Sequence, residues 1–329
     1  SDTPLKLPGA ATTPVPPVQV KQRNSRQPTS ESGQNTDAPL TGLKVLDFMW
    51  VIAGPFFTRV LADYGATVIK VESSTKLEPA RGSPTFKNGE PGLESGVPFA
   101  NFNAGKLGIT VDPSNPAGRE VILDLVRWAD VVTESFSPKA MKAWNLDYEA
   151  LREVNPDIIM VSSCLMGQTG PQAQVPGYGN MAAAITGFYD LTGWSDRSPA
   201  GPFLAYTDGV SPRFMLASLL AALDHRRRTG RGQHIDLSQA EAALHLLVPA
   251  ILDYQLNDHL WHRDGNRDRD LCPHGVYPTR GVDRWIAIAC QSDRAWVAFQ
   301  TVLGWVEDES LATVDARRLR QDELDRRIG

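Results

Sequence analysis

A strand, a helix and a second strand follow one another between residues 43 and 72, and this succession constrains the fold more than any other feature. Residues 43–48 and 67–72 are short apolar runs that predict strands, with a turn at residues 53–55. Residues 56–64 place Phe56, Val60 and Leu61 on one side of a predicted helix, which Gly65 ends. Two strands joined through a helix run parallel, because the crossover returns the chain to the same end of the sheet. We therefore expect a parallel sheet.

The alternation of strands and helices continues along the chain. Further strands are predicted at residues 108–111, 130–134, 158–164 and 234–237, and helices at residues 115–128, 148–154, 212–228 and 239–254. In the last of these helices, Ala242, Leu246, Ala250 and Leu252 give a broad apolar face. This order predicts an α/β fold: a doubly wound, Rossmann-like parallel sheet with a core on both faces.

A strand–helix–strand unit also suggests dinucleotide binding, with Glu72 as the acid that contacts the ribose. That function needs a glycine-rich turn after the first strand. Only Gly54 is available there, so the sequence argues against an NAD site.

The character of the sequence changes near residue 255. Residues 256–272 predict a polar loop, residues 275–278 and 285–290 a hairpin, and residues 293–303 a helix. We expect a large domain at residues 39–255 and the start of a smaller α+β domain at residues 256–329, truncated within a polar helix. Residues 1–38 have no aromatic side chain and many Pro, Thr, Ser and Gln, which is typical of a disordered linker or tail.

The composition excludes several classes of protein. A formal net charge of −5 gives no basic field for nucleic acid. There is no apolar run long enough to predict a membrane span. Cys164, Cys272 and Cys290 are too few and too scattered for a disulfide framework or a zinc site, and no metal site is predicted. Their small number favours a reducing, cytoplasmic location.

Asp208 is the side chain with the most functional promise. It follows a short apolar run and precedes Ser211 and Pro212, which predict the start of a helix. The positive end of that helix would favour the ionised carboxylate, and Gly209 would let a ligand approach the backbone. From the local pattern, Asp208 is either a helix-capping residue or a nucleophilic or basic carboxylate.

A series of segments resembles the class III coenzyme A transferase family, which includes formyl-CoA transferase and carnitine CoA-transferase and has α-methylacyl-CoA racemase as a relative. In order and spacing, the resemblance extends over about residues 39–329. The segments are residues 40–47 (LTGLKVLD), 53–55 (AGP), 61–72 (LADYGATVIKVE), 103–106 (NAGK), 130–132 (DVV), 146–148 (LDY), 155–156 (NP), 167–171 (GQTGP), 176–178 (PGY) and 229–233 (TGRGQ).

The resemblance implies a large domain with a doubly wound sheet, a smaller second domain, and two chains threaded through each other as an interlocked homodimer. It implies an acyl-CoA and a free carboxylic acid as substrates. Coenzyme A is then a substrate, and no metal is needed.

Counted back from residues 229–233 without a gap, Asp208 falls on the family's catalytic aspartate. The resemblance implies that this carboxylate attacks the acyl-CoA thioester and forms a mixed anhydride. CoA thiolate then converts the anhydride into an aspartyl-CoA thioester, from which the acceptor acid takes the CoA. Covalent catalysis of this kind divides one difficult exchange into easier steps.

Other residues match family positions that bind CoA. Val51, Ile52 and Ala53 lie on the first strand–helix loop, which lines the CoA site in the family; a simple buried loop is the alternative. Phe136 matches an aromatic residue near the adenine, and Tyr178 a residue beside the thiol end. For Lys106 we expect either a position near the CoA phosphates or an ordinary surface position.

Gly179 departs from the family pattern, because many members carry an acidic residue directly after the tyrosine. Its absence predicts slower turnover or a different acceptor. Two other functions remain open. One is racemisation of a 2-methylacyl-CoA, although the racemase histidine falls at Tyr178, a poor base at neutral pH. The other is a non-catalytic CoA-binding half of a tandem fusion.

Overall fold

Six parallel strands form the central sheet of the molecule. The computed structural model describes residues 38–329, and the tail predicted at the N-terminus lies outside them except for Ala38. The sheet has the order β3-β2-β1-β4-β5-β6, and each neighbouring pair is parallel. The strands are β1 (Lys44–Phe48), β2 (Thr67–Glu72), β3 (Leu107–Thr110), β4 (Val131–Glu134), β5 (Ile159–Cys164) and β6 (His234–Ser238).

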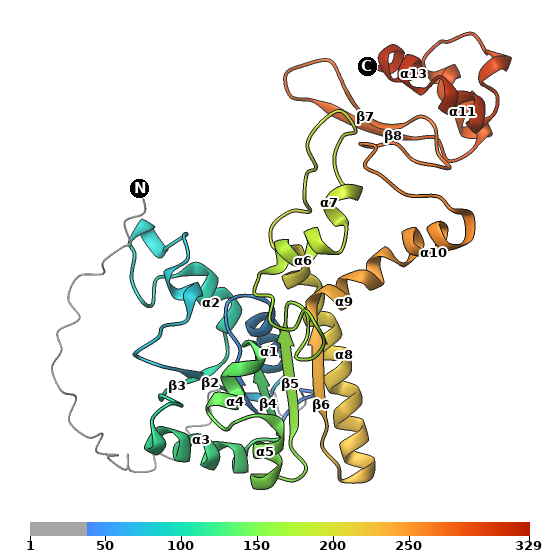
Figure 1. The fold of residues 1–329 in the computed structure, drawn as a ribbon. Helices are drawn as coiled ribbons and strands as arrows, with labels where there is room; N and C mark the ends of the chain where they lie inside the picture. Colours follow the sequence, from blue (N-terminus) through green and yellow to red (C-terminus); the bar gives the residue numbers. More distant parts are fainter. Residues whose placement is uncertain (1–37) are drawn as a thin grey trace. The chain divides into compact units, whose positions relative to one another are not determined.

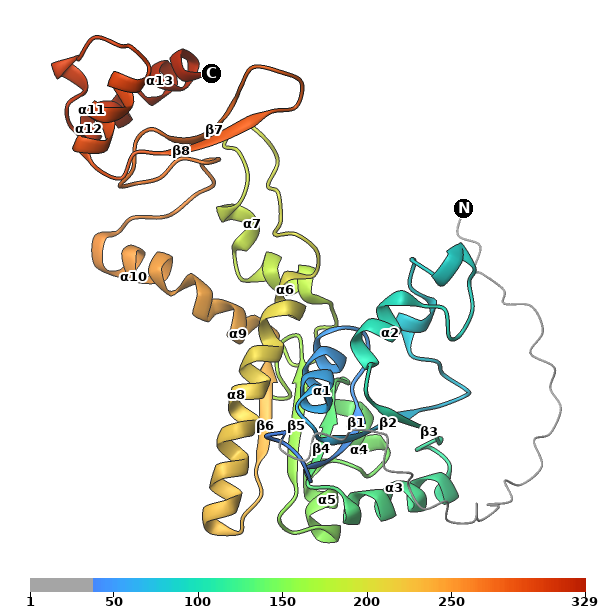
Figure 2. The same ribbon diagram turned by 180° about the vertical axis from the view of Figure 1, so that it is seen from behind.

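Helices cover both faces of this sheet, which confirms the doubly wound α/β fold predicted from the sequence (Figure 1). On one face, α1 (Ala53–Asp63) and α8 (Tyr206–Thr229) bury Phe57, Leu61 and Leu219 against the strands. On the other, α3 (Pro116–Trp128), α4 (Pro138–Ala143) and α5 (Tyr148–Val154) contribute Ile122, Val126 and other apolar side chains. Both views show α8 running beside β6 (Figure 2).

The strand order places a crevice between β1 and β4. From β1 the chain winds to β2 and β3 on one side, and it returns to β4 on the other. The loops that leave the carboxyl ends of β1 and β4 therefore diverge. Ligands of doubly wound proteins bind at such a switch point, outside the carboxyl ends of the strands.

The buried side chain of Asp47 ties the elements around this crevice together. Its carboxylate accepts hydrogen bonds from Met49 N (2.9 Å), Thr58 Oγ1 (2.7 Å) and Thr133 Oγ1 (3.0 Å). Lys106 Nζ completes the set with an ion pair of 3.0 Å. Asp47 thus joins β1, α1, β4 and the segment that leads into β3.

Two helix starts differ from the sequence prediction. Residues 53–55 form the first turn of α1 and not a separate turn, because Pro55 lies where a helix needs no N–H donor. Helix α8 begins at Tyr206, so Asp208 is in its first turn and Pro212 lies inside the helix. Pro212 removes only the hydrogen bond to the Asp208 carbonyl, and the helix tolerates this loss so near its start.

The helix predicted at residues 239–254 is divided into two. Helix α9 (Gln239–Leu244) passes through a 3₁₀ turn at His245–Leu247 into α10 (Val248–Asn257). Pro249 lies in the first turn of α10 and cannot donate to the preceding turn, which accounts for the break. The predicted apolar face is only partly buried: Ala242 is buried, whereas Leu246 and Leu252 are 45% and 47% exposed.

Three further short helices belong to this part of the chain. They are α2 (Val97–Asn103), α6 (Gly179–Ile185) and α7 (Phe188–Leu191). Helix α6 packs against both α8 and α9.

The last part of the described chain has a small core of its own. Strands β7 (His274–Pro278) and β8 (Trp285–Ala289) form the predicted hairpin. They are followed by α11 (Asp293–Val302), α12 (Val314–Leu319) and α13 (Gln321–Ile328). This core includes Cys272, Cys290, Trp296, Leu311 and Leu324. The boundary expected at residue 255 stays a prediction.

Within residues 38–329, no helix is both long and apolar enough to cross a bilayer. The three cysteines are free thiols.

We expect Asp47→Ala to destabilise the protein by about 3–5 kcal/mol, because it leaves the buried Lys106 ammonium without its counter-charge. Chemical denaturation of wild type and variant measures this loss. The matched control is Asp63→Ala, which removes an exposed ion pair with Arg59 and should change stability by less than about 1 kcal/mol. Equal losses in the two variants would contradict the role assigned to Asp47.

Candidate active site

A large cleft lies at the switch point of the sheet. This central cleft has a volume of about 690 Å³ and is lined by the loops that follow β1, β4 and β5, by residues 173–178, and by Asp208 and Gln239. The loop after β1 and the first residues of α1 contribute residues 50–54, and the loop after β4 contributes Ser135, Phe136 and Ser137. The strand order alone predicts a ligand site at this place.

The loop after β1 is held in an unusual conformation. Val51 has φ +69°, which is rare for a β-branched residue. Its N–H donates to Glu78 Oε1 (2.8 Å), and Trp50 N–H donates to Ser135 Oγ (2.8 Å). Lys70 Nζ donates to the carbonyl of Met49 at 2.6 Å. These fixed contacts impose a backbone shape that Val51 alone does not favour, as is common at ligand sites.

An aromatic cleft adjoins the central cleft. It has a volume of about 350 Å³, and the two clefts share Trp50, Lys76, Phe136 and Ser137. The Phe136 ring makes edge contacts with Trp50 and Trp144, at centroid distances of 5.1 and 5.4 Å. Lys76 is the only cation that lines either cleft within the described residues. Glu72, which is paired with Arg81, and Asp112 also line this cleft, so its aromatic walls suit a flat ring and Lys76 is its one positive charge among residues 38–329.

Asp208 lies on the wall of the central cleft, in the first turn of α8, and is only 4% exposed. Burial raises the pKa of its carboxyl to about 6, although hydrogen bonds from the Gln239 side chain and the Gly179 backbone act in the opposite direction. The effect of burial on this pKa is therefore larger than that of the positive helix end, which was expected to favour the ionised form. With a pKa near 6, the ionised carboxylate is still the main form at neutral pH.

Asp208 also lines a third cleft, besides the central cleft. This apolar cleft has a volume of about 590 Å³, and it shares Ile52 and Asp208 with the central cleft. Its walls include Phe56, Phe102 and Phe214. Asp208 thus lies where two cavities of different character meet.

The structure brings most of the predicted residues together. Val51, Ile52, Ala53, Phe136, Tyr178 and Asp208 all line the central cleft.

Lys106 is the exception. Its ammonium is buried and contacts Asp47 Oδ2 (3.0 Å), Thr58 Oγ1 (2.7 Å), Asn103 Oδ1 (2.9 Å) and the Pro55 carbonyl (3.1 Å). The alternative of a surface lysine is wrong. The expected place near the CoA phosphates stays a prediction, although the three N–H groups of the ammonium already have acceptors within the protein.

Among the cleft residues that the sequence analysis missed are Trp50, Lys76 and Gln239. Trp50 is adjacent to the predicted loop and could have been included for that reason. Lys76 is one exposed lysine in a polar loop, and Gln239 begins a helix. Nothing in their local sequence marks either of them.

Gly179 packs directly against Asp208. A Cβ at position 179 would lie 2.7 Å from Asp208 N and 2.8 Å from both its Cγ and Oδ1. Thr207 Oγ1 lies 3.0 Å from the Gly179 carbonyl and 3.0 Å from Gln239 Oε1, which fixes α6, α8 and α9 around this point. In this backbone arrangement, no side chain at position 179 can be accommodated beside Asp208.

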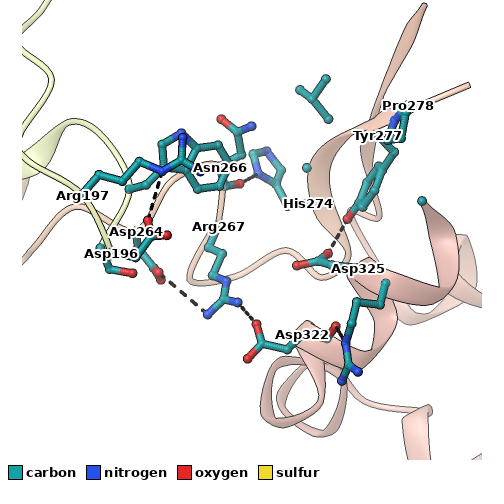
Figure 3. Close-up of a pocket in the computed structure, with 16 residues that line it drawn as sticks. Asp196, Arg197, Asp264, Asn266, Arg267, His274, Tyr277, Pro278, Asp322 and Asp325 are labelled. Atoms are coloured by element: carbon teal, nitrogen blue, oxygen red, sulfur yellow. Dashed lines mark hydrogen bonds and ion pairs between the residues drawn. The ribbon is translucent and has the colours of Figure 1, made fainter.

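A fourth, polar cleft of about 620 Å³ lies in a different part of the molecule and contains none of the predicted residues (Figure 3). Its charged groups pair with one another: Arg267 with Asp264 and Asp322, and the Tyr277 hydroxyl with Asp325 at 2.7 Å. Because these charges are already compensated, the central cleft is the better candidate for an active site.

A sheet of Rossmann order, with a cleft at its switch point, defines a doubly wound α/β protein. The profile of "CoA-transferase family III" matches residues 40–329, and the chain belongs to this family. The resemblance predicted from the sequence is confirmed.

Named relatives of this chain are CoA-transferases. It is 34% identical over 299 residues to succinyl-CoA–D-citramalate CoA-transferase of Chloroflexus aurantiacus, covering 89% of this chain and 73% of the relative. It is 33% identical over 288 residues to succinate–glutarate CoA-transferase of Agrobacterium fabrum, covering 86% and 72%. A CaiB/BaiF family structure from Brucella suis matches with a TM-score of 0.79 and 34% identity, covering 88% of this chain and 76% of that one.

We expect Gly179→Ala to lower the CoA-transfer rate about 100-fold, because the new methyl group displaces the Asp208 carboxylate. The control is Gly108→Ala, in strand β3, where a Cβ meets no atom within 4 Å. Rates of both variants, measured alongside their thermal unfolding, separate a displaced carboxylate from general destabilisation. A Gly179→Ala variant with the wild-type rate would show that the close approach does not position Asp208.

Proposed function

We propose that this protein transfers coenzyme A from an acyl-CoA to a free carboxylic acid, with Asp208 as the nucleophile. The position of Asp208 carries the proposal: it is almost fully buried, and it lies between two clefts that could hold the two halves of a thioester. Membership of CoA-transferase family III supports the same reaction class.

The proposed steps balance without an external acid or base. An Asp208 carboxylate oxygen attacks the thioester carbonyl and the C–S bond breaks. This step releases CoA thiolate and forms a mixed anhydride between the acyl group and Asp208. The thiolate then attacks the aspartyl carbonyl of the anhydride and releases the first acid as a carboxylate. The acceptor carboxylate attacks the resulting aspartyl-CoA thioester, forms a second anhydride and frees the thiolate. Finally, the thiolate attacks the acceptor carbonyl, which yields the new acyl-CoA and restores Asp208.

The surroundings of Asp208 suit this role. Its raised pKa makes it a stronger nucleophile than an exposed carboxylate, yet leaves it ionised at neutral pH. Burial also protects an anhydride from hydrolysis by limiting access of water.

For CoA we propose a path along the joined clefts. The adenine would lie in the aromatic cleft beside Phe136 and Trp50, with Lys76 near the phosphates. The pantetheine arm would follow residues Val51, Ile52 and Ala53 through the central cleft. The thioester would then reach Asp208 near Tyr178.

We expect Asp208→Ala to lower the exchange of label between an acyl-CoA and its free acid at least about 1,000-fold. In the wild type the rate should fall as the pH drops below about 6, because protonation removes the attacking carboxylate. Gln239→Leu should shift this acidic limb to higher pH, since the lost hydrogen bond stabilises the ionised form.

The control for this experiment is Asp315→Ala, which removes another first-turn carboxylate, in α12 and outside the clefts. It should exchange label at the wild-type rate. Retained exchange in Asp208→Ala would exclude Asp208 as the nucleophile. Exchange absent from wild type as well, despite bound CoA, would favour the non-catalytic alternative.

The racemase alternative has little support at this site. A histidine base is needed, and within the described residues no histidine lines the central or the apolar cleft. Incorporation of deuterium at the α-carbon of a 2-methylacyl-CoA in D₂O would revive this alternative.

We further propose a cytoplasmic homodimer with interlocked chains. The apolar side chains exposed on α9 and α10, among them Leu244, Ile251, Leu252 and Leu256, support burial by a second copy. Sedimentation equilibrium should give twice the mass of the chain, and a monomer at micromolar concentration would contradict the proposal.

A further inference from the structure

Arg213 is a cation in the apolar cleft that the proposed chemistry does not use. Apart from Asp208, it is the only charged residue lining that cleft among residues 38–329. Its side chain is exposed and forms no ion pair with a described carboxylate. An unpaired guanidinium beside aromatic walls is available to an anionic ligand.

The guanidinium lies near the reactive end of the cleft. Arg213 follows Asp208 by five residues on α8, and its Nη1 donates to the Gly209 carbonyl, on the turn that carries Asp208. Side chains on a helix point toward its N-terminus, which accounts for this direction. The other guanidinium N–H groups remain free for a ligand, since arginine has five donors in a planar fork.

Apart from Tyr206, the other side chains that line the cleft are apolar. Ile52, Phe56, Phe102, Val210 and Phe214 line the space around Asp208 and Arg213. Methylene groups are favoured against such walls, whereas an unpaired carboxylate is not. The cleft therefore complements a short hydrocarbon chain that carries a second negative charge, placed so that it can reach Arg213 while the reacting group meets Asp208.

We infer that the apolar cleft selects dicarboxylic acids, and that Arg213 binds the carboxylate that does not react. The inference rests on the proposed function, because it takes Asp208 as the point of attack. A dicarboxylate entering the cleft meets repulsion from the ionised Asp208, and Arg213 offsets it. The planar guanidinium can bind the distal carboxylate through two parallel hydrogen bonds.

A different role for Arg213 would be to bind the reacting carboxylate of any acceptor acid. The two roles differ in their consequences. If Arg213 binds the reacting carboxylate, its loss should slow exchange with dicarboxylic and monocarboxylic acids equally. If it binds the carboxylate that does not react, its loss should slow exchange with dicarboxylic acids selectively.

The test compares two identity exchanges: succinyl-CoA with labelled succinate, and butyryl-CoA with labelled butyrate. These acids have the same carbon number and differ by one terminal carboxylate. In wild type we expect kcat/KM to be higher for the succinyl pair. Arg213→Gln should lower the ratio of succinyl to butyryl kcat/KM about 10- to 100-fold, and Arg213→Lys should restore part of it.

The matched control is Arg227→Gln, which removes an exposed arginine from the last turn of the same helix, far from the cleft. It should leave the ratio unchanged. An unchanged ratio in Arg213→Gln, or equal loss of both exchanges, would overturn the inference. Absence of both exchanges in wild type would instead contradict the proposed function, so the two failures are distinguishable.

Discussion

The buried contact between Asp47 and Lys106 is the interaction on which the site depends. Asp47 lies one residue before the end of β1, at the switch point of the sheet, and its carboxylate also accepts hydrogen bonds from Met49, Thr58 and Thr133. These contacts fix the direction in which the loop after β1 leaves the sheet. Val51 in this loop has a positive φ, which a valine rarely adopts. The central cleft begins at this loop, so the shape of the cleft is set by charges inside the fold.

Two buried aspartates at the same edge of the sheet have opposite electrostatics. Burial by itself raises the pKa of Asp47, but the charges of Lys106 and Lys70, with hydrogen bonds from Thr58 and Met49, prevail and lower it. Asp208 is similarly enclosed but has only the neutral donors Gln239 and Gly179, and its pKa rises. The difference in partners separates a structural carboxylate from a potentially reactive one.

Much of this arrangement was predictable from the sequence. Apolar runs and turn residues predicted all six strands of the sheet, and the family resemblance named six of the residues that line the central cleft. The failures concern information that is not local. The pattern of NAGK marks Lys106 as notable but does not say that its charge faces inward to Asp47. Pro212 and Pro249 had opposite effects: one is tolerated inside α8, and the other separates α9 from α10. Lys76 acquires its significance only because two clefts meet beside it.

The contact between Gly179 and Asp208 has a consequence for how members of this family can diverge. These two positions lie on different helices and share one volume, so no side chain can be added at position 179 while Asp208 and the backbone stay still. A relative with an acidic side chain at the position of Gly179 must set its α6 helix farther from α8. A change from glycine to an acidic residue at position 179 therefore requires a change in the spacing of α6 and α8. Exchanging that single residue between a glycine-type site and an acidic-type site would not transfer the chemistry of one to the other.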